Sequence, residues 1–123
     1  MTAAARSVLA FGIYMLGQGA ILMLVPALLL EPFAIPGADS PWVRVVGWAL
    51  MALGAYYVLA ARHEWRAMFR LTVAVRLGQL AFFAALCATT SAPWVLLAFS
   101  AVEAAAGVWT ALALRAETAM ETA

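Results

Sequence analysis

Four long apolar segments, separated by short polar or proline-containing stretches, make up nearly the whole chain. They cover residues 7–30, 42–61, 67–88 and 93–115. Each is close to the roughly 20 apolar residues that a helix needs to cross the hydrocarbon core of a bilayer. We therefore predict an all-α protein, in which a single domain forms an antiparallel bundle of four membrane-spanning helices.

Prolines and polar residues punctuate these segments. Glu31 precedes a proline and is expected to end the first helix, because that position disfavours helical backbone angles. Ser40 and Pro41 predict the start of the second helix, as N-cap and first helical residue. Pro26 is expected to kink the first helix. Residues 116–123 are expected to form a frayed acidic tail.

The distribution of arginine predicts how the helices are oriented. With four spans, the N-terminus, the middle connection and the C-terminus share one side of the membrane. That side carries Arg6, Arg62, Arg66, Arg70 and Arg115, and the other side carries Arg44 alone. Cytoplasmic loops carry the excess of basic residues, so we expect both termini in the cytoplasm. The use of Arg without Lys, with much Ala and Val, suggests a bacterial source and therefore the inner membrane.

Composition excludes several classes of protein. The chain is 67% hydrophobic and 11% charged, against about 25% charged residues in soluble domains. A net charge of +1 gives no reason to expect a nucleic-acid partner. One cysteine and one histidine exclude a disulfide, a multi-cysteine metal site and a bis-histidine haem within this chain. No nucleophile–base pair or phosphate loop is visible, so we expect neither an enzyme nor a cofactor of its own.

Two short sequence matches raise the hypothesis of an internal repeat. Pro41-Trp42-Val43 and Pro93-Trp94-Val95 open the two even-numbered segments, and Leu16-Gly17-Gln18 and Leu77-Gly78-Gln79 lie in the odd-numbered ones. A duplicated helical hairpin would place such matches at equivalent positions. Chance is the alternative, because a chain rich in Leu, Ala and Gly produces short matches easily.

Polar side chains inside the apolar segments define the candidate site. Arg76 and Glu103 lie at depths of ~13 and ~18 Å from the cytoplasmic end, at about 1.5 Å of rise per residue. Ionisable residues at such depths usually face the helix-bundle interior or a cavity. Helical spacing places Thr72, Arg76 and Gln79 on one face of their helix. The same spacing gives the last helix a matching stripe of Ser100, Glu103, Gly107 and Thr110. We predict a polar centre formed by Gln18, Arg76, Gln79 and Glu103.

Three interpretations of this polar centre remain open. An ion pair between Arg76 and Glu103 would fix the register of the helices, whereas a binding site would hold a small molecule, a lipid or a proton. The third is a salt bridge across the interface of an oligomer. Arg44 lies about one turn inside the opposite interface, where it snorkels outward, pairs with Glu31 or lines a vestibule that leads to Glu103. Gly47 and Gly54, with Met51, provide a small-residue face for close helix packing.

These positions resemble those of the DoxX-like group of small bacterial four-helix membrane proteins. The resemblance rests on Arg44-Val45-Val46-Gly47, on Arg76-Leu77-Gly78 and on Val102-Glu103, and in architecture it covers nearly the whole chain. It implies that Arg44, Arg76 and Glu103 are the matching polar positions. One member of the group is associated with a quinone-linked oxidoreductase, and no residue here carries that chemistry over.

Three functions follow from the sequence. The first is a non-enzymatic accessory subunit or a binder of a lipid-like molecule in the helix-bundle interior. The second is a membrane component of a quinone-linked redox system, with the cofactor on another chain. The third is a proton-coupled transporter that uses Glu103. The expected partners are membrane lipid, a lipid-like or quinone ligand, and a partner membrane subunit or a second copy of the chain.

Overall fold

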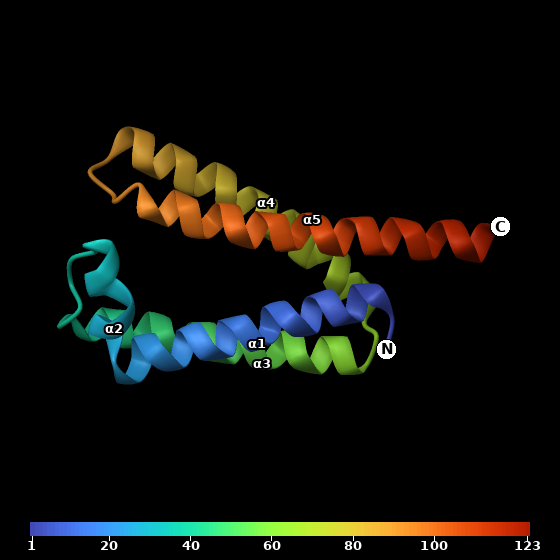
Figure 1. The fold of residues 1–123 in the computed structure, drawn as a ribbon, viewed down its shortest axis with the longest axis horizontal. Helices are drawn as coiled ribbons and strands as arrows, with labels where there is room; N and C mark the ends of the chain where they lie inside the picture. Colours follow the sequence, from blue (N-terminus) through green and yellow to red (C-terminus); the bar gives the residue numbers. More distant parts are fainter. The chain divides into compact units, whose positions relative to one another are not determined.

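The computed structural model describes residues 1–123 and contains helices without any strand. The long helices are α1 (Ala3–Leu24), α3 (Pro41–Arg62), α4 (Arg66–Thr89) and α5 (Val95–Thr122); the short α2 (Pro26–Leu30) and the 3₁₀ helix η1 (Glu31–Phe33) follow α1 (Figure 1). All four long helices are long and apolar enough to cross a membrane. The predicted all-α class with four long apolar helices is thus confirmed, and the antiparallel helix pairs fit a four-helix bundle.

The chain divides into two compact units. One unit contains residues 9–59, with most of α1 and α3 and the connection between them. The other contains residues 1–8 and 60–123, so the first turns of α1 pack with α4 and α5. Within each unit, two long helices form an antiparallel pair.

Four glycines bring α1 and α3 into close contact in the unit of residues 9–59. Gly12 lies against Gly54 and Gly19 lies against Gly47, which makes the two helices antiparallel. A Cβ atom at Gly19 would lie 2.6 Å from the carbonyl oxygen of Gly47, closer than real Cβ contacts. The small-residue face predicted on α3 is therefore confirmed, and α1 contributes a matching face that the sequence analysis did not identify.

The first helix ends earlier than predicted, because the chain breaks at Pro26. Residues 7–30 do not form one helix: α1 ends at Leu24, Val25 has φ −138° and Pro26 is the first residue of α2. Since proline has no backbone N–H, it fits the first position of a new helix better than the interior of a continuing one. The expected kink is therefore a complete break.

Arg44 caps the end of α1 that this break leaves open. Its Nη1 donates hydrogen bonds to the carbonyl oxygens of Met23, at 2.6 Å, and Leu24, at 3.4 Å. These carbonyls belong to the last turn of α1, where the helix dipole favours a positive charge. The expectation that Arg44 pairs with Glu31 is wrong, because the carbonyls at the helix end take its hydrogen bonds.

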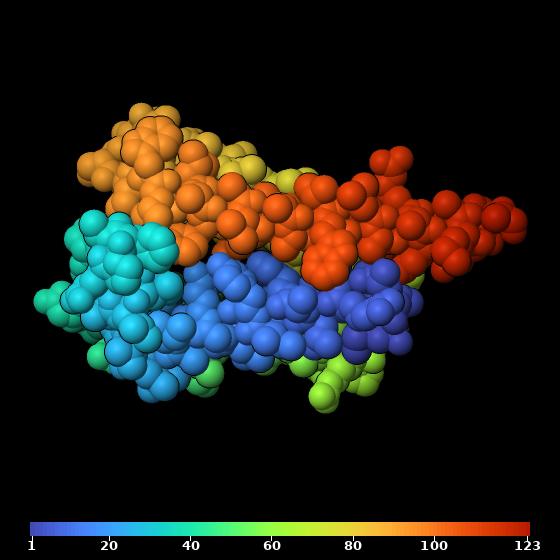
Figure 2. Space-filling model, viewed as in Figure 1, coloured from blue at the N-terminus to red at the C-terminus, as the bar shows by residue number.

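The last helix is longer than predicted at its C-terminal end. The segment expected at residues 93–115 begins at Val95 and continues to Thr122, so residues 116–123 are not a frayed tail. Its 28 residues correspond to a length of about 42 Å, against a hydrocarbon core of about 30 Å. The last turns project as a lone helix (Figure 2, red), in agreement with the 78% exposure of Met120. α5 is therefore longer than a helix needs to be to cross the hydrocarbon core.

Candidate functional site

Polar side chains line the faces along which α4 and α5 meet. On α4, Thr72 and Arg76 are buried and Gln79 is half-buried. On α5, the residues that share the facing stripe are buried or half-buried: Ser100, Glu103, Gly107 and Thr110. The predicted stripes on these two helices therefore do turn inward within this unit.

A short hydrogen bond joins the two helices at mid-length. Nε2 of Gln79 donates to Oε2 of Glu103 at 2.6 Å. Glu103 lies eight residues after the start of α5, or about 12 Å along the helix, so this bond is far from either helix end. The structure thus brings together two of the four residues predicted for the polar centre, and it does so through an amide–carboxylate hydrogen bond.

Arg76 lies on the same face of α4 and is 1% exposed. Its Nε donates to Oγ1 of Thr72 at 3.1 Å, one turn earlier on the helix. Its aliphatic carbons lie against Gly107 of α5, where a Cβ atom would be 3.4 Å from Cβ and Cδ of Arg76. Arg76 and Glu103 therefore lie on the facing stripes of α4 and α5, while the hydrogen bond of Glu103 is made to Gln79.

Gln18 and Arg44 belong to the unit of residues 9–59. Gln18 is half-buried on α1, and its Oε1 is buried without a hydrogen-bond partner. Its participation in the polar centre stays a prediction. Arg44 has the helix-capping role described above, at the end of α1.

This face offers hydrogen-bonding groups and charge between two apolar helices. An amide, a carboxylate and a buried guanidinium together provide hydrogen-bond donors, acceptors and charge. The Ser100 hydroxyl, fully buried on the same stripe of α5, has no hydrogen-bond partner in the structure. No group of three residues able to hold a metal ion is present.

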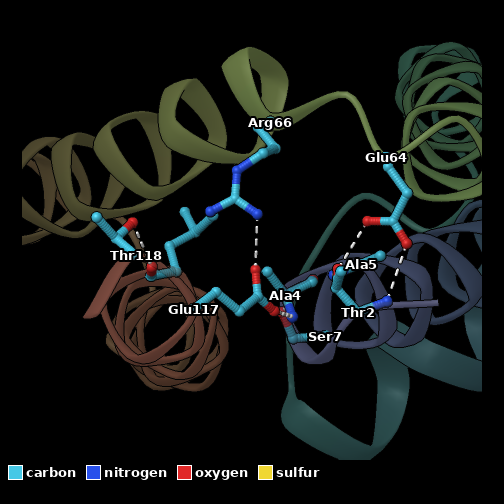
Figure 3. Close-up of polar contacts among 9 residues, drawn as sticks. Thr2, Ala4, Ala5, Ser7, Glu64, Arg66, Glu117 and Thr118 are labelled. Carbon is cyan, nitrogen blue, oxygen red and sulfur yellow. Dashed lines mark hydrogen bonds and ion pairs between the residues drawn. The ribbon is translucent and has the colours of Figure 1, made fainter. Parts of the chain in front are cut away.

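A second polar cluster surrounds the first turn of α1, in the unit that also contains α4 and α5 (Figure 3). Thr2 donates to Glu64 twice, from its backbone N–H to Oε1 at 2.9 Å and from its hydroxyl to Oε2 at 2.7 Å. The Thr2 hydroxyl also accepts the backbone N–H of Ala5 at 3.1 Å. Thr2 is therefore the N-cap of α1, and Glu64 holds that cap in place.

Glu117 connects α1, α4 and α5 in this cluster (Figure 3). Its Oε1 accepts the backbone N–H of Ala4 at 2.9 Å, and its Oε2 forms an ion pair with Arg66 at 2.9 Å. One turn deeper, the buried hydroxyls of Ser7 and Thr110 are hydrogen-bonded at 2.8 Å. Two carboxylates thus satisfy N–H groups at the start of α1, where the helix dipole favours negative charge. We call Thr2, Glu64, Arg66 and Glu117 the α1 clasp.

Glu64 occupies an unusual backbone position in the clasp. It has φ 51°, in the left-handed region that favours glycine. The bonds from Trp65 N–H to Ala60 O, at 3.0 Å, and from Glu64 N–H to Ala61 O, at 3.2 Å, form a Schellman motif at the end of α3. The hydrogen bonds from the Thr2 side chain and backbone lower the pKa of the Glu64 carboxyl. This carboxylate, which glycine would lack, is what binds Thr2.

The α1 clasp was not predicted. Glu117 lies in the segment expected to be a frayed tail, and no role was expected for Thr2 or Glu64. A signal was nevertheless present: a threonine stands before the first helix, and acidic residues stand near two other ends on the same predicted side of the membrane. A threonine before an apolar helix predicts an N-cap, and the shared side predicts that the acidic residues are neighbours.

Comparisons of the chain with protein-family models, with curated proteins and with solved structures gave no match.

Proposed function

We propose that this chain is a small, non-enzymatic protein of a bacterial inner membrane that binds a lipid-like molecule. The polar group of that molecule is held by Gln79 and Glu103, beside Arg76. The apolar remainder lies along the neighbouring helix surfaces. Both termini are cytoplasmic in this proposal, because five arginines lie on the side of the termini and one lies on the other.

The observation that carries the proposal is the half-buried hydrogen bond between Gln79 and Glu103 at mid-length of two apolar helices. A charged residue at the centre of a spanning helix costs about 2.5–3.5 kcal/mol on insertion scales. The small-residue contacts of α1 and α3 show that these helices pack closely without ionic groups. Helices of this chain can therefore pack without a polar face that fixes their register. This favours a binding role for the polar face of α4 and α5.

The resemblance to the DoxX-like group supports the same proposal. The positions that carry it are Arg44, Arg76 and Glu103. Two of them, Arg76 and Glu103, lie on the polar face of α4 and α5. Arg44 caps α1, which gives that position a structural role. In this proposal the group shares a fold that uses one arginine for a helix end and two charged residues for the ligand.

Native mass spectrometry of the purified protein, combined with analysis of its organic extract, tests the proposal. In mild detergent, the wild-type protein is expected to carry one co-purifying small molecule. The double variant Arg76→Leu/Glu103→Leu removes both charges together and so avoids an uncompensated buried charge. We expect it to fold and to lose the molecule. The matched control is Val102→Leu, at a 62% exposed position next to Glu103, and it is expected to keep the molecule.

Loss of the molecule from both the double variant and the control would contradict a site at Glu103. So would its retention by the folded double variant, which would leave the polar face with a structural role. Quinone absorption in the extract would identify the ligand as a quinone and favour the redox-linked alternative.

Proton-coupled transport is the second candidate, and Glu103 favours it. It is the one carboxylate within the long apolar segments, and a neutral amide is its hydrogen-bond donor. A carrier of this kind predicts that Glu103→Gln abolishes proton-driven uptake of the identified molecule into proteoliposomes while binding is retained. A binder predicts no uptake by the wild-type protein.

A further inference from the structure

A depression lies where the connection between α1 and α3 meets the ends of these helices, within the unit of residues 9–59. It is open and has a volume of about 310 Å³. Its apolar lining comes from Leu24, Val25, Pro26, Ala27 and Ala38. Part of the surrounding segment, residues 28–40, is visible at the molecular surface in Figure 2, in cyan. The volume is at the lower limit of the range typical of small-molecule sites.

Charges of both signs line the same depression. Glu31 and Asp39 provide carboxylates and Arg44 provides a guanidinium. All three residues are exposed and therefore accessible to a ligand. The depression thus combines an apolar surface with two negative groups and one positive group.

The guanidinium of Arg44 is held in place by the backbone. Nη1 donates to the carbonyl oxygens of Met23 and Leu24 at the end of α1. Arginine has five N–H donors, so further donors remain for an anionic oxygen. A positive group fixed in this way requires less ordering when a ligand binds.

The position of the depression indicates what kind of molecule reaches it. It lies at the ends of two helices that are apolar enough to span a membrane. Leu24, Val25 and Leu28 nearby are exposed, as is Trp42 at the start of α3. Exposed tryptophan is typical of the membrane–water interface. The headgroups of phospholipids occupy this level, with their acyl chains beside the apolar residues.

A metal ion is a poorer match for this depression. Hard cations such as Ca²⁺ take six to eight oxygen ligands, several of them carboxylate. Here two carboxylates share the site with a guanidinium, and no group of three metal-ligating residues is present. The positive charge of Arg44 would repel the ion.

We propose that this depression binds the headgroup of an aminophospholipid, with the primary ammonium held by Glu31 and Asp39 and the phosphate held by Arg44. A primary ammonium donates charge-assisted hydrogen bonds to carboxylates, and a guanidinium donates them to phosphate. This site is separate from the polar face of α4 and α5, and its existence does not depend on the function proposed for that face.

Competitive native mass spectrometry tests this site. The detergent-solubilised protein is mixed with equal amounts of phosphatidylethanolamine and phosphatidylcholine that have identical acyl chains. The two lipids differ by three N-methyl groups, which remove every N–H donor from the ammonium. We expect the wild-type protein to bind phosphatidylethanolamine at least fivefold more than phosphatidylcholine.

The variant Glu31→Gln/Asp39→Asn is expected to bind the two lipids about equally. The control Glu121→Gln removes one exposed carboxylate at the far end of α5 and is expected to keep the preference. Thermal unfolding of both variants confirms that they are folded. Arg44 is left unchanged in this comparison, since its replacement would also uncap α1.

Three results would overturn the proposal. One is equal binding of the two lipids by the wild-type protein. Another is a preference that survives in the Glu31→Gln/Asp39→Asn variant. The third is loss of the preference on addition of EDTA, which would assign the carboxylates to a bridging metal ion.

Discussion

Side chains of single residues hold the two ends of α1 in place. Arg44 caps the last turn of α1. In the first turn, Thr2 and Glu117 accept hydrogen bonds from backbone N–H groups. Glu64 holds Thr2 in place. A helix leaves about four N–H groups and four carbonyls without internal partners. The side chains that cap α1 come from α3, from α5 and from the connection after α3. Its ends are therefore fixed by tertiary contacts.

Glu64 predicts a specific dependence of stability on pH. Because its pKa is lowered in the folded protein, its contribution is present above the unfolded pKa, near 4.5, and is lost as the pH falls through the folded pKa. Glu64→Gln keeps a side chain of the same size at the same backbone angles. We expect it to lower Tm in detergent at pH 7, and we expect the two Tm values to converge as the pH falls below 4.5 and through the folded pKa.

The control for this experiment is Glu121→Gln, at an exposed position near the end of α5. Its Tm is expected to follow that of the wild-type protein at both pH values. A constant difference between Glu64→Gln and wild type across this range would contradict the role assigned to the Glu64 carboxylate.

Replacement of Arg44 tests the cap at the other end of α1. Arg44→Gln removes the guanidinium that binds the carbonyls of Met23 and Leu24. We expect a loss of about 1 kcal/mol in the free energy of unfolding, the usual size for one intramolecular hydrogen bond. Arg70→Gln, at an exposed position of α4, serves as the control in thermal unfolding. Equal Tm values for the two variants would show that the cap does not stabilise the helix end.

At the scale of elements, the two helix pairs use different contacts. Glycine on both helices lets the backbones of α1 and α3 touch. Between α4 and α5, the side chains of Arg76 and Gln79 lie against Gly107 and Glu103. Close backbone contact allows dense packing of apolar helices in lipid, whereas the second pair presents functional groups. The glycines therefore allow close packing of α1 on α3, whereas the polar residues place hydrogen-bonding groups between α4 and α5.

Two glycines of α1 provide a matched test of the close contact. A Cβ atom at Gly19 would lie 2.6 Å from Gly47 O, whereas one at Gly17 would meet nothing within 4 Å. Gly19→Ala is expected to lower the free energy of unfolding by about 1–3 kcal/mol, as overpacking does. Gly17→Ala is expected to be neutral or stabilising by up to about 1 kcal/mol. Thermal unfolding of both variants in one detergent measures these changes. Similar effects at both positions would contradict the packing of α1 on α3.

Glu117 tests whether the extension of α5 is held by the α1 clasp. Glu117→Ala removes the ion pair with Arg66 and the hydrogen bond from Ala4 N–H. We expect a loss of about 1–2 kcal/mol, since both groups are partly buried. Glu121→Ala, one turn later and exposed, is expected to change little. Hydrogen exchange of residues 3–8 should increase in the first variant alone; unchanged exchange there would contradict the clasp.

At the scale of the whole molecule, the sequence predicts the helices better than their ends. The segments expected at 42–61 and 67–88 agree within one residue with α3 and α4, because hydrophobic length fixes a membrane span. The end of α5 could not be predicted in this way, since Glu117 is held by contacts with Ala4 and Arg66. Pro26 signalled a disturbance of the helix, but spacing alone does not show that α1 ends at Leu24 or that Arg44 binds its last carbonyls.

The candidate site could also be predicted only in part. Helical spacing and depth correctly placed Gln79 and Glu103 on facing stripes, because a helix repeats every 3.6 residues. Spacing alone does not show whether Arg76 or Gln79 binds Glu103, because this depends on side-chain rotamers and packing. In the structure the hydrogen bond comes from Gln79. The duplicated hairpin and the orientation with both termini in the cytoplasm stay predictions.

The proposed function depends on the depth of Glu103 in the membrane, because a water-exposed α5 would place no polar group within the bilayer. This depth is measured most directly with a spin label at Val102, an exposed neighbour, after Cys87→Ala and reconstitution into bilayers. A second label at Met120 marks the water. We predict that the label at 102 collides readily with dissolved oxygen and rarely with a water-soluble nickel chelate. Accessibility of position 102 to nickel equal to that of position 120 would show that this part of α5 lies in water and not in the bilayer.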